Sequence, residues 1–106
     1  MRLLVRSKGL ELSDDLRDFT EDRLRFALGR FGQRIKDVRV QLTDINGPRG
    51  GEDVDCRVEA TLMPSGSLRI RDLDSDAFKA VARASDRLGT RMARHLERRR
   101  AHRRRA

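Results

Sequence analysis

Arginine side chains near the C-terminal end of this 106-residue chain have the type and spacing needed to bind a polyanion. They recur every three or four residues, which places them on one side of a helix, within about 90° of one another. The five positions are Arg83, Arg87, Arg91, Arg94 and Arg98. A helix rises about 22 Å over this length, and guanidinium groups can bind phosphate oxygens bidentately. The row predicts contact with successive phosphates; a solvated helix face is the alternative.

The net charge of the chain, +8, is concentrated in its last thirty residues. From Ala77 to Ala106 there are eleven basic residues and two acidic ones, whereas the rest of the chain holds slightly more acids than bases. Charge gathered at one end of a molecule indicates a polyanionic partner such as a nucleic acid.

A further arginine, Arg23, falls within the apolar face of the first predicted helix. Its side chain could extend to the rim of that face and pair with an acid. It could also lie between two helices and reach for phosphate together with Arg87 or Arg91. Nearby basic residues would widen the patch in the second case: Arg25, Arg30 and Arg34.

No catalytic or metal-binding constellation is predicted. Two His and one Cys are too few for a zinc site built from nitrogen and sulfur ligands. We interpret His95 and His102 as surface residues and Cys56 as a small core residue. Asp53 and Asp55, the nearest approach to a carboxylate pair, are expected to be solvated at a strand end. The expectation is a protein without enzymatic activity, cofactor, metal or small-molecule substrate.

Hydropathy and aromatic content further restrict the kinds of partner that the chain is expected to bind. No apolar run exceeds three residues, so no membrane span is expected. Basic residues flank the first run closely, which argues against a secretory signal peptide, and the lone cysteine suits the cytoplasm. The four phenylalanines are expected on core-facing stripes: Phe19, Phe26, Phe31 and Phe78. Recognition of a nucleic acid would then rest on its backbone and not on stacking with its bases.

Periodicity predicts the elements that position these side chains. Strands are expected over 2–7, 38–43, 54–62 and 68–70, and helices over 14–31 and from 77 onward. Ser13 is the predicted cap of the first helix and Gly32 its end. A loop is expected at Asn46–Gly51, and an acidic connection at 72–76.

The order β-α-β-β-β-α predicts an α+β fold in which two helices cover one face of a four-stranded sheet. We expect one domain over 1–98, followed by a disordered basic tail over 99–106.

With this order of elements, the sequence resembles the bacterial ribosome hibernation factor family in its short form. The resemblance covers roughly residues 1–98, in the stretches "GLELSDDLRDFTEDRLRFALGRF", "KDVRVQL" and "SDAFKAVARASDRLGTRMARHLERR". It implies a fold similar to double-stranded RNA-binding domains, and docking in the small-subunit cleft where messenger and transfer RNA lie. The implied partners are the small ribosomal subunit and its RNA, and the implied outcome is inhibition of translation. The implied RNA-facing residues are Arg23, Arg83, Arg87, Arg91 and Arg94.

Two other classes of protein fit the residues as well. One is a general module that binds double-stranded RNA or DNA, and the other is a protein-interaction module whose basic helix meets an acidic partner.

The sequence departs from the family it resembles in two places. The glycine-rich loop is longer than in the family, and we expect the chain to lack the dimerisation domain of the long forms. The oligomeric state stays open.

Overall fold

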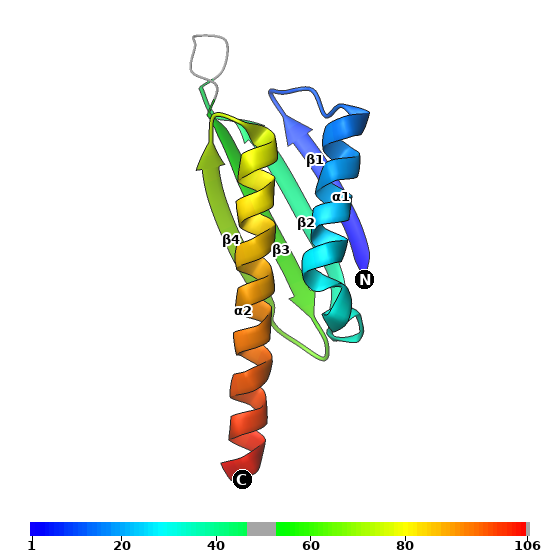
Figure 1. Ribbon diagram of the computed structural model, residues 1–106, viewed down its shortest axis with the longest axis vertical. Helices are drawn as coiled ribbons and strands as arrows, with labels where there is room; N and C mark the ends of the chain where they lie inside the picture. The colour runs from blue at the N-terminus through cyan, green and yellow to red at the C-terminus, as the bar shows by residue number, and fades with distance from the viewer. Residues whose placement is uncertain (47–52, 106) are drawn as a thin grey trace.

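The strands and helices follow one another in the predicted order, with a short 3-10 helix, η1, after the first helix (Figure 1). The structure is a computed structural model that describes residues 1–46 and 53–105. The elements are β1 Arg2–Lys8, α1 Asp14–Leu28, η1 Gly29–Arg34, β2 Ile35–Asp44, β3 Val54–Leu62, β4 Ser67–Asp74 and α2 Ala77–Arg105. The predicted loop Asn46–Gly51 falls mainly on 47–52, outside the described residues.

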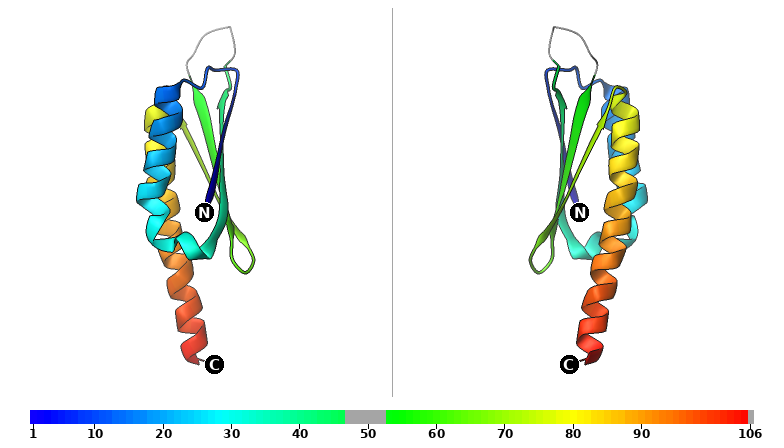
Figure 2. Two further views of the ribbon diagram at one scale, coloured as in Figure 1. Left: turned by 90° about the vertical axis from the view of Figure 1, so that its right-hand side faces the viewer. Right: turned by 90° about the vertical axis from the view of Figure 1, so that its left-hand side faces the viewer.

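The four strands form one mixed sheet in the order β1-β2-β3-β4. β1 runs parallel to β2, and the other neighbouring pairs are antiparallel. Both helices lie on the same face of the sheet, as the two side views show, and no helix of residues 1–46 and 53–105 lies on the opposite face (Figure 2). The predicted α+β fold is confirmed.

The core forms where alternating apolar side chains of the strands meet the helices. Val40 pairs with Val58, and Val58 pairs with Ile70, so one row of buried side chains crosses three strands. Cys56 and Leu88 are both fully buried, the first from the sheet and the second from α2. Because strand side chains alternate between faces, the residues between these positions point away from the helices.

Helix α1 is shorter than its apolar pattern predicts. It begins as expected, since the backbone N–H of Leu16 donates a hydrogen bond to Ser13 Oγ at 3.1 Å. It ends at Leu28, and Gly32 lies inside η1 instead of capping the helix. Phe26 was expected in the core and is 85% exposed. The buried row follows an i, i+4 line ending at Leu28, and Phe26 lies off that line.

The two helices touch closely near the middle of α2. A Cβ atom at Gly89 would lie 3.1 Å from the backbone oxygen of Ala27, so only glycine fits here without a shift. Nearer the helix starts, the rings of Phe19 and Phe78 meet edge to face with centroids 5.1 Å apart. These two contacts hold α2 against α1. Buried side chains such as Leu88 pack α2 against the sheet.

Helix α2 is longer than predicted and extends past the sheet (Figure 1). Its last fully buried side chain is Met92, and residues 100–104 are exposed. The predicted disordered tail over 99–106 is instead helical as far as Arg105. Extending a formed helix needs no new nucleation, and arginine and alanine are strong helix formers. The overhang contributes to the length of the molecule, 56 Å along its longest axis.

Candidate nucleic-acid interface

The row of five arginines divides into two parts according to what lies beside it. In the second part, Arg91, Arg94 and Arg98 are exposed, and no ion pair or hydrogen bond joins their side chains to any other described residue. No acid lies among them except Glu97, which also forms no ion pair in the described chain. This half of α2 therefore presents uncompensated positive charge to solvent.

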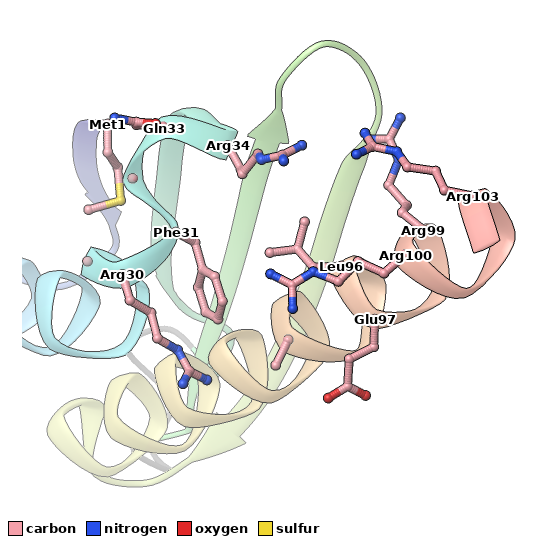
Figure 3. Close-up of a pocket in the computed structure, with 13 residues that line it drawn as sticks. Met1, Arg30, Phe31, Gln33, Arg34, Leu96, Glu97, Arg99, Arg100 and Arg103 are labelled. Atoms are coloured by element: carbon pink, nitrogen blue, oxygen red, sulfur yellow. The ribbon is translucent and has the colours of Figure 1, made fainter.

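A basic cleft opens between η1 and the overhanging part of α2 (Figure 3). Its volume is about 880 Å³. Five arginines line it, two from the η1 side and three from α2: Arg30, Arg34, Arg99, Arg100 and Arg103. The guanidinium carbon of Arg30 lies 4.6 Å from the centre of the Phe31 ring, a cation–π distance that orients this side chain. An anion entering the cleft would meet positive charge from two segments.

Sequence reasoning missed this cleft. Arg30 and Arg34 were recognised as basic residues near the end of α1, but three of the lining arginines were assigned to a disordered tail. The cleft exists because the chain turns back through η1 beside a helix that continues past the sheet. Strong helix propensity in the final residues was the one available signal.

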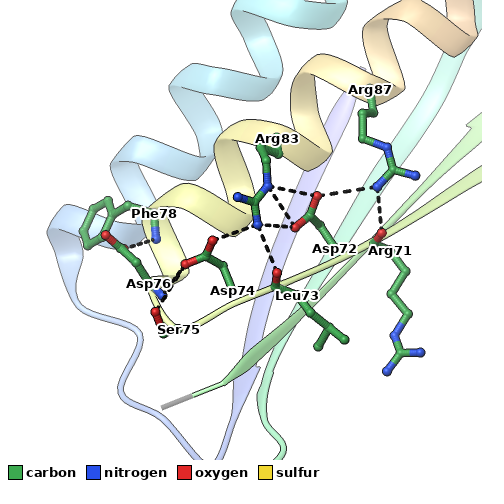
Figure 4. A network of polar contacts seen from close by, with 9 residues as sticks. All are labelled: Arg71, Asp72, Leu73, Asp74, Ser75, Asp76, Phe78, Arg83 and Arg87. Atoms are coloured by element: carbon green, nitrogen blue, oxygen red, sulfur yellow. Dashed lines mark hydrogen bonds and ion pairs between the residues drawn. The ribbon is translucent and has the colours of Figure 1, made fainter. Parts of the chain in front are cut away.

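The first part of the row, Arg83 and Arg87, is held by carboxylates of β4 (Figure 4). Arg83 Nη2 lies 2.7 Å from Asp72 Oδ1 and 2.8 Å from Asp74 Oδ2. Arg87 Nη1 donates to the backbone oxygen of Arg71 at 2.9 Å and lies 3.5 Å from Asp72 Oδ2. These two arginines fasten α2 to the edge strand.

Electrostatics reinforces this network. Hydrogen bonds to Asp72 and then Asp74 raise the pKa of Arg83 above its ordinary value. The pKa of Asp74 is lowered, first by the backbone N–H of Asp76 and also by the Arg83 guanidinium. Both shifts favour the charged forms. The sequence assigned these aspartates to a connection, whereas β4 continues through Asp74 and directs both toward α2.

Arg23 lies between the helices and pairs with an acid of α2. Its Nη2 atom is 2.8 Å from Asp86 Oδ1 and 3.5 Å from the backbone oxygen of Ala82. Its Nε atom is buried and has no hydrogen-bond partner among the described residues. The structure thus shows the ion-paired arrangement of Arg23. Binding of a phosphate by Arg23 together with Arg87 or Arg91 stays a prediction.

The remaining predicted residues are placed separately. Arg25 Nη1 lies 3.6 Å from Glu21 Oε2 on the same helix, in an i, i+4 ion pair whose arginine side chain is exposed. His95, expected at the surface, is half-buried, and its Nε2 atom has no hydrogen-bond partner among the described residues.

No group of three or more His, Cys, Asp or Glu within residues 1–46 and 53–105 could hold a metal ion. Burial, followed by the charges of Asp72 and Asp55, raises the pKa of the Cys56 thiol to about 12. The thiol therefore stays protonated at neutral pH and is a poor nucleophile. Among the helices described, none has the length and apolar character needed to span a bilayer.

Comparisons with known proteins agree with this fold. A family model described as "Sigma 54 modulation protein / S30EA ribosomal protein" matches residues 3–100. The crystal structure of the Protein Y N-terminal domain from Thermus thermophilus is 27% identical, with a TM-score of 0.73, covering 90% of this chain and 99% of that one. A ribosomal subunit interface protein from Coxiella burnetii is 16% identical, with a TM-score of 0.77, covering 92% of this chain and 99% of that one. The search of curated proteins returned no match.

Proposed function

This chain belongs to the Sigma 54 modulation protein / S30EA ribosomal protein family, and from that premise we propose that it binds ribosomal RNA of the small subunit and inhibits translation by occupying the decoding channel. The predicted family resemblance is confirmed by the match over residues 3–100. One observation carries the proposal: basic side chains without carboxylate partners cover the second half of α2 and continue into the η1 cleft.

The mechanism is exclusion without chemistry. An elongated molecule, 56 Å long and about 20 Å across its shorter axes, occupies the space that messenger and transfer RNA need. Arginines along α2 neutralise backbone phosphates, and the counterions released from the RNA favour binding at low salt. The phosphate contacts hold the protein in place while its bulk blocks the channel.

The eight arginines proposed from the sequence contribute unequally. Arg91, Arg94, Arg98 and Arg30 are available for RNA as they stand, and the cleft adds Arg34, Arg99, Arg100 and Arg103. Arg25 lies at the margin, because its exposed pair with Glu21 is weak and can exchange for a phosphate.

Arg83 is held most firmly. Its partners Asp72 and Asp74 have side chains only 10% and 18% exposed. Removing the guanidinium would leave Asp74 without its ion pair and Asp72 with only the longer contact to Arg87. Arg87 and Arg23 use one terminal nitrogen for their ion pairs and can share the guanidinium with a phosphate.

Ribosome co-sedimentation tests the proposal. Arg91→Glu/Arg94→Glu reverses two charges on the available half of α2, and we expect affinity to fall at least tenfold. Each lost phosphate contact should flatten the log–log dependence of affinity on salt by about 0.7–0.9. Arg17→Glu/Lys79→Glu is the matched control, because it reverses two exposed charges in the first turns of α1 and α2. Equal binding by both variants would contradict the proposal.

Two further measurements separate the other classes. A general duplex-binding module would bind free double-stranded RNA as tightly as ribosomes. A module for acidic proteins would keep its partner after nuclease treatment of an extract. A decoding-channel inhibitor should instead be displaced from the small subunit by messenger and transfer RNA together.

A further inference from the structure

Helices α1 and α2 lie on one face of the sheet (Figure 2). The pairing register places many arginines on the other face. Strand alternation and the pairing register place seven basic and three acidic side chains on it. The basic ones are Arg2, Arg6, Lys8, Arg39, Arg57, Arg69 and Arg71. The acidic ones are Asp37, Asp55 and Glu59. We call these residues the open sheet face; it carries an excess of four positive charges.

The acids of the open sheet face lie beneath the arginines. Asp55 was expected to be solvated, yet its side chain is only 4% exposed, whereas those of Arg57 and Arg71 are 67% and 55% exposed. One oxygen of Asp55 accepts from Arg57 Nε at 3.0 Å and the other accepts from Arg71 Nε at 2.9 Å. A single buried carboxylate thus holds two guanidinium groups at the surface.

Each ion pair on this face uses the same nitrogen of the arginine. Arg69 donates from Nε to Glu59, and Arg39 Nε lies 4.0 Å from Asp37 Oδ1. The terminal nitrogens of these arginines, like those of Arg57 and Arg71, donate no hydrogen bond to other described residues. This differs from Arg83, which uses Nε and Nη2 for its carboxylates. Three guanidinium groups of the open sheet face, those of Arg57, Arg69 and Arg71, are therefore oriented by a hydrogen bond from Nε, and their terminal nitrogens stay free to bind a ligand.

The arginines surround a hollow in the sheet surface. Its volume is about 760 Å³, and its lining includes Arg6, Arg39, Gln41, Arg57, Arg69 and Arg71. No aromatic side chain belongs to the open sheet face, whose positions are all described, so nucleobases have nothing to stack on. The chemistry that fits is a chain of phosphates, which oriented guanidinium forks bind bidentately.

We propose that the open sheet face is a second RNA-binding surface, which holds the phosphate backbone of an RNA segment distinct from the one bound by α2. The proposal rests on the proposed function in that its ligand is RNA. Helix α2 lies on the other face of the sheet, and its basic half extends past the end of the sheet (Figures 1 and 2). The two basic surfaces therefore belong to different elements, and one protein can bind two RNA segments at once and join them.

A triple substitution tests this surface while preserving the fold. Arg6→Gln/Arg39→Gln/Arg69→Gln leaves both partners of buried Asp55 in place, and Glu59 is exposed enough to be solvated alone. Arg39 makes no hydrogen bond to the buried Asp37, whose nearest oxygen lies 4.0 Å from Nε, and thermal unfolding of the variant checks that the loss of this pair leaves the fold intact. We expect the salt dependence of ribosome binding to flatten by about 2–3 in log–log slope and affinity to fall at least tenfold. Arg6→Lys/Arg39→Lys/Arg69→Lys should restore part of that affinity, because it keeps charge and loses only the fork.

Bridging is measured separately, with two RNA duplexes of about 16 base pairs carrying different fluorophores. Wild-type protein should bring the two duplexes together and produce energy transfer. The triple Gln variant and Arg91→Glu/Arg94→Glu should each bind one duplex and give no transfer.

The outcomes separate the two proposals. Unchanged slope, affinity and transfer in the triple Gln variant would overturn the second surface while leaving the first intact. Displacement of RNA from this face by polyglutamate as readily as by RNA would assign it to an acidic protein instead, and would also overturn it. If wild-type protein fails to bind ribosomes, the proposed function fails, and the duplex measurement still decides whether this face binds RNA.

Discussion

The two halves of α2 carry the same residue at the same spacing, yet they do different things. In the first half, Arg83 and Arg87 meet Asp72 and Asp74 and fasten the helix to β4. In the second half, Arg91, Arg94 and Arg98 form no ion pair with any other described residue. The function of a basic helix face is therefore decided by the residues beside it as much as by its own sequence.

The cause of the difference lies in β4. Its side chains that face α2 change along the strand, from the apolar pair Leu68 and Ile70 to the acidic pair Asp72 and Asp74. Because α2 begins next to the acidic end of β4, only its first turns find carboxylates. Farther along, the helix first rests on apolar side chains and then leaves the sheet.

The largest effect on stability should come from a substitution in the first half of α2. Leu88→Ala removes a fully buried side chain of α2 and should lower the free energy of unfolding by about 2–5 kcal/mol. Arg94→Ala, in the other half, should change it by less than about 0.5 kcal/mol. Urea denaturation followed by circular dichroism measures both. A similar loss in the two variants would show that the halves share one structural role.

A smaller effect, on affinity for ribosomes, should follow from removing the carboxylates that hold the first half of α2. Asp72→Asn/Asp74→Asn removes the carboxylates that occupy Arg83 and Arg87. We expect affinity for ribosomes at low salt to rise about threefold to tenfold, because attraction to a polyanion grows with uncompensated charge. Asp14→Asn/Asp15→Asn, at the start of α1, is the control for a general change in net charge. An equal rise in the affinity of the control would show that net charge, and not the position of the carboxylates on β4, determines the gain.

The smallest effect should be on the loss of folding stability at acidic pH. The folded pKa of Asp74 is lowered, so this residue adds stability that is complete above the unfolded value of about 3.9. That stability is lost as the pH falls through the folded pKa, when the protonated carboxyl weakens its hydrogen bond from the backbone N–H of Asp76 and its ion pair with Arg83. Thermal unfolding between pH 2 and 7 should show a shallower acid decline in Asp74→Asn than in wild type. Identical pH profiles would mean that the pair is not linked to folding.

Sequence periodicity predicted the elements well where burial alone determines them. The alternation over Val54–Leu62 matches β3 in full, because every second side chain is apolar. The end of β4 was misassigned because its inward positions change from apolar to acidic while the strand continues to Asp74. Hydrophobic alternation stops there, although the hydrogen-bonded pairing with β3 does not.

The candidate surfaces were predicted only in part, because charge summed along the chain differs from charge gathered in space. Residues 1–76 are almost neutral in sequence, yet strand pairing collects Arg39, Arg57 and Arg71 on one face. The same applies to Arg23, whose partner Asp86 lies 63 positions away. Local patterns predicted the exposure of many side chains but not that of Phe26 or Asp55, and only the register identifies the neighbours of each residue.

The helical overhang changes the thermodynamics of recognition. Ordering the backbone of a flexible residue costs about 1–2 kcal/mol, so an unstructured basic tail would lose much of its electrostatic gain on docking. Here the arginines beyond Leu96 belong to a helix that already packs in the core. Their backbone is ordered before docking, so little backbone entropy is lost on binding. The same charges on a stiff arm also reach a fixed distance, which favours a partner of matching shape over any passing polyanion.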